Sequence, residues 1–176
     1  VSEQDYLIGI IPAGGRSWGK EAYRKHWAPE RFAALADKIV ANKQSQIIIM
    51  GDFCEQEIAQ KVSSSMKSKA IDFSGKTTLG QLAALLNKMR LVVTNDGGPL
   101  HMAVALGIKT VSIFGPVDEK VYGPYPVSDR NIIIKTDIPC RPCYKKFRMP
   151  DCFNNRQCID SISVDEVFLE VGRLLE

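Results

Sequence analysis

The stretch "VVTNDGGPLHMAVALG", residues 92–107, begins as an apolar strand and continues as an apolar helix. The junction carries an acid, two glycines and an imidazole that packing alone would not require: Asp96, Gly97, Gly98 and His101. The glycines remove side chains from the turn, and Pro99 suits the first helical position because it has no N–H to leave unpaired. Unpaired backbone N–H groups and the helix dipole then point at one place, which is typical of an anion site, most commonly for phosphate.

Two structural alternatives stand beside this interpretation. Asp96 could be an ordinary helix cap, and His101 could be a core histidine bonded to a backbone carbonyl. Between Pro99 and Ile108, however, His101 is the only polar side chain. We therefore expect a helix buried on nearly all sides, and the place of His101 in the first turn favours contact with a ligand.

The rest of the chain alternates short apolar strands with helices. Strands are predicted at residues 6–12, 46–51, 70–75, 91–95, 110–115 and 131–135, and helices at 29–42, 55–66, 77–89, from Pro99 and from Val164. Thr78 and Ser163 are the expected N-caps. Strands that are apolar along their whole length, alternating with helices, predict an α/β fold with a doubly wound, Rossmann-like parallel sheet. Ligands bind such sheets at the carboxyl ends of the strands, which selects the loops 13–27, 51–57 and 95–101.

Composition narrows the class of protein further. The 176 residues are 45% hydrophobic and 24% charged, as expected for one globular domain. The net charge of +3 suits an anionic ligand or membrane surface without implying nucleic acid. No apolar run reaches the roughly 20 residues of a transmembrane helix, and no signal-peptide pattern is present, so a cytoplasmic protein is the expectation.

Two loops carry charged residues of interest. The loop 13–27 contains four cations against Glu21: Arg16, Lys20, Arg24 and Lys25. A cation there could neutralise a diphosphate, although solvated basic loops are common. The phosphate-loop pattern of nucleotide triphosphatases fails, because Lys20 is followed by an acid instead of a hydroxyl residue. After the second strand, Glu55 or Glu57 could hold a ribose, or both could serve as acids at the start of a helix.

A longer stretch carries a family resemblance. Residues 73–119, "FSGKTTLGQLAALLNKMRLVVTNDGGPLHMAVALGIKTVSIFGPVDE", resemble the carboxyl-terminal half of the ADP-heptose:lipopolysaccharide heptosyltransferases, glycosyltransferase family 9. The likeness extends to "KHWAPERFAALA", to the cysteine-rich segment and to "SISVDEV". That family has the GT-B fold, with two Rossmann-like domains facing across a cleft. The resemblance implies that residues 1–176 are one donor-binding domain, with a Cys-rich basic excursion at 140–158, and that the amino-terminal acceptor domain lies outside this chain.

The resemblance also assigns residues. The family's donor-binding positions fall on Lys25, Glu55, Asp96, Gly97, Gly98 and His101, with Gly97 in a slot that is usually threonine and Glu57 as an alternative to Glu55. Lys25 would stabilise diphosphate charge and Asp96 would orient Lys25 or a sugar hydroxyl. The catalytic base, an aspartate, is expected in the missing domain.

The activity that the resemblance implies is an inverting, metal-independent sugar transfer that requires no cofactor. The donor would be a nucleotide-diphosphate sugar, with ADP-heptose expected, and the acceptor a lipopolysaccharide core bound through the missing domain. Such an enzyme would work in the cytoplasm, with peripheral contact at the inner membrane.

Four cysteines, Cys140, Cys143, Cys152 and Cys158, could bind a structural zinc ion, or they could be reduced thiols or disulfides formed on purification. Their segment has five basic residues against Asp151, which could attract anionic headgroups: Arg141, Lys145, Lys146, Arg148 and Arg156. Two other functions remain open. One is a zinc-stabilised module that binds nucleic acid or phospholipid, and the other is a sugar-nucleotide epimerase of similar architecture.

Overall fold

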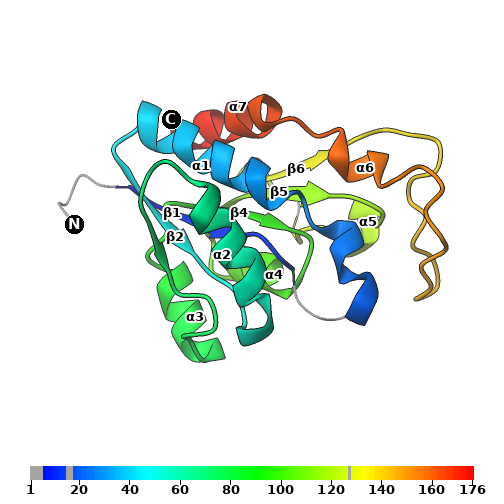
Figure 1. The fold of residues 1–176 in the computed structure, drawn as a ribbon, viewed down its shortest axis with the longest axis horizontal. Helices are drawn as coiled ribbons and strands as arrows, with labels where there is room; N and C mark the ends of the chain where they lie inside the picture. The colour runs from blue at the N-terminus through cyan, green and yellow to red at the C-terminus, as the bar shows by residue number, and fades with distance from the viewer. Residues whose placement is uncertain (1–5, 15–17, 127) are drawn as a thin grey trace.

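The fold is a six-stranded parallel sheet covered by helices on both faces (Figure 1). The computed structural model describes residues 6–14, 18–126 and 128–176, with Lys20 described without its side chain. The strand order is β3-β2-β1-β4-β5-β6, and every neighbouring pair is parallel. The strands are β1 Tyr6–Ile11, β2 Ser45–Ile49, β3 Ala70–Asp72, β4 Leu91–Asn95, β5 Lys109–Phe114 and β6 Asn131–Lys135. The predicted doubly wound α/β sheet is confirmed.

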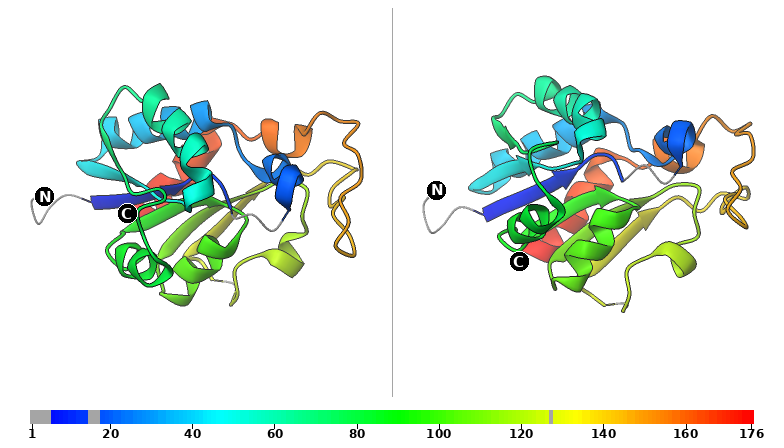
Figure 2. Two further views of the ribbon diagram at one scale, coloured as in Figure 1. Left: turned by 60° about the horizontal axis from the view of Figure 1, so that its bottom comes forward. Right: turned by 90° about the horizontal axis from the view of Figure 1, so that it is seen from below.

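The helices form two layers (Figure 2). One face of the sheet packs on α1 (Pro29–Asn42), α2 (Gln56–Ser65), α6 (Gln157–Asp160) and α7 (Val164–Leu175), and the other on α3 (Leu79–Leu86) and α4 (Gly98–Ala105). Three short helices lie in loops: η1 Gly19–Lys25, η2 Phe53–Glu55 and α5 Glu119–Tyr122. Thr78 and Ser163 cap α3 and α7, as predicted. Within the described ranges, no helix is both long and apolar enough to cross a membrane.

The central strands carry apolar residues on both sides because each face of the sheet has its own core. In β1, Ile8 and Ile10 join the cluster formed with α1, α2 and α7, whereas Ile11 joins the cluster formed with α3 and α4. In β4, Val93 and Val92 divide in the same way. Successive side chains point to opposite faces, so a sheet covered on both faces is apolar at most positions, and buried polar residues such as Asn95 are the exceptions.

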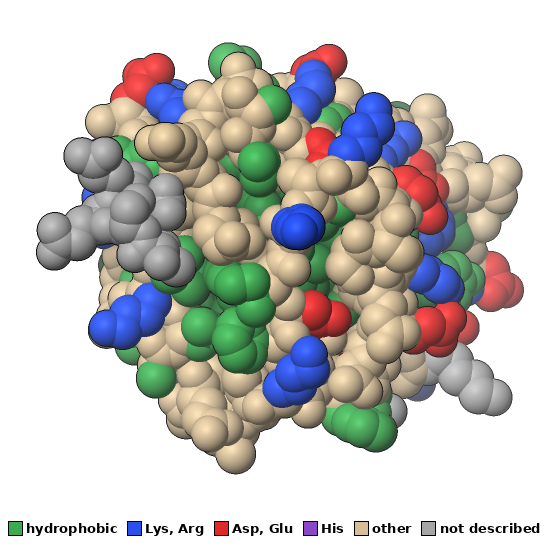
Figure 3. All heavy atoms as spheres, turned by 60° about the vertical axis from the view of Figure 1, so that its left-hand side comes forward, with side chains coloured by type: hydrophobic (Ala, Val, Ile, Leu, Met, Phe, Trp, Pro, Cys, Tyr) green, Lys and Arg blue, Asp and Glu red, His purple; other side chains and the backbone are tan. Residues whose placement is uncertain are grey.

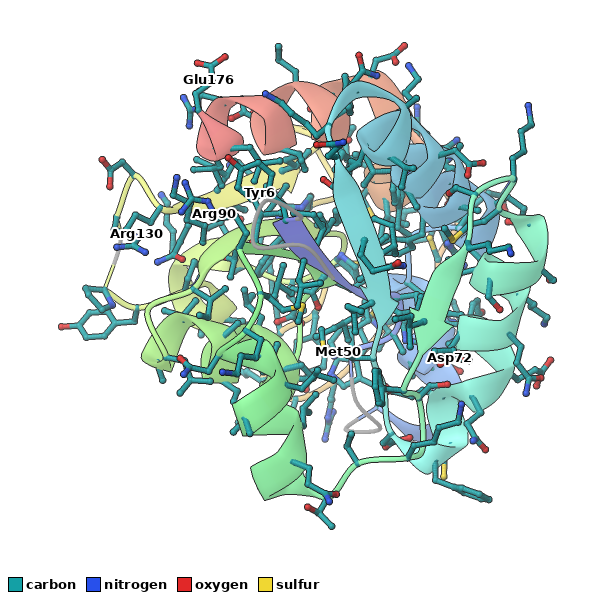
Figure 4. All side chains as sticks on the ribbon, turned by 90° about the vertical axis from the view of Figure 1, so that its left-hand side faces the viewer. Tyr6, Met50, Asp72, Arg90, Arg130 and Glu176 are labelled. Carbon is teal, nitrogen blue, oxygen red and sulfur yellow. The ribbon has the colours of Figure 1, made fainter. Side chains whose placement is uncertain are left out.

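The strand order reverses between β1 and β4, because the chain builds outward from β1 through β2 and β3 and then returns to β4. Loops leaving neighbouring strands at such a switch point diverge and leave a crevice. The carboxyl ends of the strands lie toward the right of Figure 1, where η1, α5 and the 140–158 segment also lie. At the amino ends, basic and acidic side chains are mixed on the surface (Figure 3), and the Arg90 guanidinium lies 5.5 Å from the centre of the Tyr6 ring (Figure 4).

Two sequence-based expectations are wrong in detail. The segment 13–27 is not loop throughout, because η1 occupies its second half. Helix α4 is not buried on nearly all sides: Leu100 and Ala103 are buried, but Ala105 and, at the C-cap, Leu106 are exposed. Because α4 is a short surface helix that packs on β4 and β5 by one side, its other side keeps apolar residues in contact with solvent.

The same substitution at a buried and at an exposed strand position should have different effects on the free energy of unfolding. Ile10→Val in β1 removes one methyl group from a fully buried site and should lower the free energy of unfolding by about 1 kcal/mol. Ile71→Val in β3, where the side chain is 43% exposed, should change it by less than about 0.5 kcal/mol. Urea denaturation measures both, and equal effects would contradict the two-sided core.

Candidate functional site

The loops that follow β1 and β4 touch each other backbone to backbone. A Cβ atom on Gly14 would lie 2.3 Å from the carbonyl oxygen of Asp96, and a Cβ on Gly97 would lie 1.9 Å from the carbonyl oxygen of Gly14. Both distances are far inside van der Waals contact, so only glycine fits this crossing. A threonine in the slot of Gly97 would require the β1 loop to lie further away.

The side chain of Asn95 joins three segments at this crossing. Its amide Nδ2 donates hydrogen bonds to the carbonyl oxygens of Pro12 (2.6 Å) and Ala13 (3.0 Å), and its Oδ1 accepts one from the N–H of Trp27 (3.0 Å). Asn95 is fully buried, so these bonds satisfy backbone groups that water cannot reach. This role of Asn95 was not predicted, although an asparagine at the end of the apolar run of residues 91–95 was the available signal in the sequence.

Lys25 lies beside the crossing and is 2% exposed. Its Nζ is 3.6 Å from Asp96 Oδ2, donates to the carbonyl oxygen of Gly14 at 3.4 Å and lies 5.1 Å from the centre of the Trp18 ring. Two residues further on, Trp27 is fully buried in the core and its indole N–H donates to Ile162 O at 2.9 Å. The core anchor at Trp27 therefore fixes the backbone that carries Lys25.

Asp96 is also buried, at 6% exposure. Burial raises the pKa of the Asp96 carboxyl above its ordinary value, while Lys25 and His101 act in the opposite direction. Asp96 does not cap α4, whose N-cap is Gly97, a residue without a side chain for that purpose. The amino end of α4 is therefore left for another group to occupy.

A pocket of about 310 Å³ opens over this pair, and we call it the Lys25 pocket. Its lining combines polar and aromatic side chains: Trp18, Lys25, Asp96, Gly97, Gly98, His101, Val117, Tyr122, Tyr144 and Phe147. The amino end of α4 supplies backbone N–H groups, and Lys25 supplies a positive charge. Together they form a site suited to an anion.

A second pocket of about 220 Å³, the Glu55 pocket, lies on the other side of the α4 start. It is lined by Ile11, Gly51, Asp52, Glu55, Thr77, Thr78, Leu79, Leu82 and Pro99. The Glu55 carboxylate accepts hydrogen bonds from the N–H groups of Gly14 (3.3 Å) and Asp52 (2.9 Å). Glu57 is exposed to solvent and pairs with Lys61 at 2.8 Å. Of the two acids, Glu55 is therefore the one that faces the crossing.

The other cations of the 13–27 loop do not join Lys25 in the part of the chain that the structure describes. Arg24 pairs with Glu21 at 2.5 Å and donates to the carbonyl oxygen of Pro150 at 2.5 Å, so it ties η1 to the cysteine-rich segment instead of entering the pocket. Arg16 and the side chain of Lys20 lie outside the described residues.

The cysteine-rich segment brings Cys140, Cys143 and Cys152 to one pocket of about 250 Å³, with Cys158 buried nearby. All four thiols are free, and burial, followed by the charges of the other cysteines, raises the pKa of Cys158 to about 11. Among the described residues, no group of three or more His, Cys, Asp or Glu side chains is arranged to hold a metal ion. The zinc site stays a prediction.

Two of the five basic side chains of this segment bind other parts of the protein and are not fully exposed. Arg141 donates to the carbonyl oxygens of Gly115 and Val117, and Arg156 donates to His26 O and pairs with Asp160. Only three of the five cations stand exposed on the segment: Lys145, Lys146 and Arg148. The basic surface is therefore smaller than the sequence indicated.

Comparisons with known proteins agree with one another. The family model described as glycosyltransferase family 9 (heptosyltransferase) matches residues 4–153. Lipooligosaccharide heptosyltransferase 2 of Campylobacter jejuni is 28% identical over 173 residues, which are 96% of this chain and 51% of that protein. The chain spans about half the length of the curated relatives it matches first.

Solved structures share the fold. The glycosyltransferase family 9 protein of Veillonella parvula superimposes with a TM-score of 0.79 at 30% identity, covering 99% of this chain and 47% of that one. An Escherichia coli heptosyltransferase solved with ADP has a TM-score of 0.70 at 18% identity and covers 99% and 46%. The second likeness is one of fold alone.

The glycine crossing can be tested with a matched pair of substitutions. Gly97→Ala should lower the free energy of unfolding by about 1–3 kcal/mol, because the new methyl group overlaps the Gly14 carbonyl. Gly98→Ala should leave it unchanged or raise it slightly, because nothing lies within 4 Å of the added atom. Thermal or urea denaturation gives the comparison, and equal stability of the two variants would rule out the contact.

His26, which lies between Lys25 and Trp27, should make the free energy of unfolding depend on pH. Burial first, and then the charges of Lys25 and Arg156, lower its pKa from 6.5 to about 4. The folded protein holds the ring neutral, so the stability present above pH 6.5 should fall as the pH drops from 6.5 to 4, by up to about 3 kcal/mol. His26→Gln should lack this part of the pH dependence. If denaturation of the two proteins between pH 7 and pH 4 shows a constant difference, the ring is not held neutral.

Proposed function

The chain belongs to glycosyltransferase family 9, and we propose that it is the donor-binding half of a heptosyltransferase that takes a sugar from ADP-heptose. The other half of such an enzyme, which would bind a lipopolysaccharide core acceptor, corresponds to the part of the relatives that this chain does not cover. The observation that carries the proposal is the buried lysine, Lys25, held beside the uncapped amino end of α4.

The diphosphate of the donor would lie at this point. A buried cation and the backbone N–H groups of Gly97 and Gly98 favour a doubly charged anion strongly, because little water competes for it. Asp96 alone would repel a phosphate, but its carboxylate pairs with Lys25 and so fixes the position of the ammonium group. We therefore assign Asp96 the orientation of Lys25, and not the role of catalytic base.

The nucleoside would occupy the Glu55 pocket, on the far side of Pro99 from the Lys25 pocket. Ile11, Leu79 and Leu82 offer apolar surface to a base. Glu55 offers a carboxylate oxygen to a ribose hydroxyl, and its bonds from Gly14 and Asp52 hold that carboxylate in place. The sugar would then extend into the Lys25 pocket, toward His101.

Transfer follows from this arrangement. An acceptor hydroxyl attacks the anomeric carbon from the side opposite the diphosphate, the bond from that carbon to the phosphate oxygen breaks, and its electron pair leaves with ADP. A carboxylate of the other domain would take the hydroxyl proton. Lys25 and the α4 amino end stabilise the charge that develops on the leaving phosphate. Because these groups are already in position before the reaction begins, no free energy is lost in reorienting them.

Calorimetry with ADP, UDP and GDP in EDTA tests the proposal. ADP should bind the wild-type domain, and Lys25→Ala should weaken ADP binding about ten- to hundredfold, which is the value of a hydrogen bond from a charged group. Lys61→Ala is the matched control, because Lys61 is an exposed lysine paired with Glu57. EDTA removes divalent metal, so the positive charge must come from the protein.

Two outcomes would contradict the proposal. One is a folded wild-type domain that binds none of the three nucleotides. The other is a Lys25→Ala variant that binds ADP as tightly as Lys61→Ala does.

A further inference from the structure

Three aromatic rings stand together on one side of the Lys25 pocket, and we call them the aromatic wall: Trp18, Tyr122 and Tyr144. The ring centres of Trp18 and Tyr144 are 4.3 Å apart with 31° between the ring planes, and those of Tyr122 and Tyr144 are 5.8 Å apart. All three line the same pocket as Asp96 and His101. They come from three separate loops, so chain continuity does not explain their meeting.

Tyr144 belongs to the cysteine-rich segment, and hydrogen bonds of that segment to the loop after β5 fix its position. The Arg141 guanidinium donates to the carbonyl oxygen of Gly115 at 2.5 Å and is paired with Glu119 at 2.9 Å. The N–H groups of Cys143 and Tyr144 both donate to the carbonyl oxygen of Pro116, at 3.0 and 3.1 Å. The segment is therefore fastened to the loop after β5, and the backbone of Tyr144 is fixed directly.

The Glu119 carboxylate strengthens this attachment. Burial alone would raise its pKa, but hydrogen bonds from Lys135 and Arg141 outweigh burial and lower the pKa to about 2. Glu119 therefore remains ionised across the physiological range and keeps Arg141 paired. The attachment combines a partly buried charge pair with several hydrogen bonds to backbone groups, and an ordinary solvent-exposed loop does not need such contacts.

The pocket has two chemically different sides. The aromatic wall offers flat apolar surface, and Asp96, His101 and Lys25 add polar groups to the same lining, with Lys25 Nζ 5.1 Å from the centre of the Trp18 ring. A sugar ring has the complementary form, with C–H bonds on its faces and hydroxyl groups around its edge. Pockets that combine aromatic rings with a few fixed polar groups orient ligands of this amphipathic kind.

We propose that the aromatic wall binds the sugar of the donor, and that the cysteine-rich segment serves to place Tyr144 against that sugar. The inference rests on the proposed function, because the diphosphate at Lys25 fixes which part of the donor reaches the wall. It adds that the preference for a sugar nucleotide over the bare nucleotide resides largely in Tyr144. Phe147, 85% exposed at the rim, belongs to the same segment.

The experiment compares the affinities of ADP and ADP-heptose by calorimetry in four proteins. Tyr144→Leu keeps apolar volume without the aromatic face and should weaken ADP-heptose binding about three- to tenfold, the range of a lost aromatic contact. ADP binding should change less than about twofold. Tyr144→Phe keeps the ring and should bind both ligands nearly as the wild type does. Phe153→Ala is the control, because Phe153 is an exposed ring of the same segment that does not line the Lys25 pocket.

The outcomes separate this inference from the proposed function. If the wild type binds neither ligand, the proposed function fails and the aromatic wall has no donor to bind. If ADP and ADP-heptose bind the wild type equally, or Tyr144→Leu weakens both to the same degree, only the present inference is overturned. Near-UV circular dichroism of each variant checks that the segment is still folded. If Tyr144→Leu is unfolded, a fifth protein, Tyr144→Ala, replaces it in the comparison with Tyr144→Phe.

Discussion

The buried amide of Asn95 is the interaction on which the site depends. It binds the end of β4 to the loop after β1 and to the backbone before α1, so three segments that are far apart in sequence meet at one point. The glycine crossing is possible because these bonds bring the two loops together. Lys25 is positioned by the same network, because it lies two residues before Trp27, whose N–H donates to Asn95. A single neutral side chain thus organises the charged groups around it.

Burial gives the Lys25–Asp96 pair its particular character. Removing either partner would leave an uncompensated charge in a poorly hydrated place, which is strongly destabilising. The pair brings a cation to the pocket without adding net charge to the interior. An arriving anion meets a cation that is already oriented and already desolvated, and little further rearrangement is needed.

The sequence predicted the six strands and the caps of α3 and α7 because those signals are local. Apolar runs bounded by turn residues, and hydroxyls that precede helical patterns, depend on neighbours a few residues away. The exposed side of α4 was not predictable, because an apolar helix is equally consistent with full burial and with one exposed face. Arg24 and Arg141 appeared as parts of basic clusters, yet their partners are carbonyl oxygens far away in sequence. The sequence could not show whether Glu55 or Glu57 faces the site, because that depends on the short helix η2, which directs Glu55 toward Gly14.

The contact between Gly14 and Gly97 has a kinetic consequence. Two loops whose backbones already touch cannot close further around a ligand, so the side of the pocket formed by Gly14 and Gly97 has little room to move. If the pocket binds the nucleotide that we propose, entry and release would depend on movement of the segment that carries Tyr144, which is attached to the β5 loop by side-chain and backbone hydrogen bonds. The residence time of that nucleotide should accordingly depend on how firmly Arg141 holds the segment, and much less on the loops that we propose as its phosphate site.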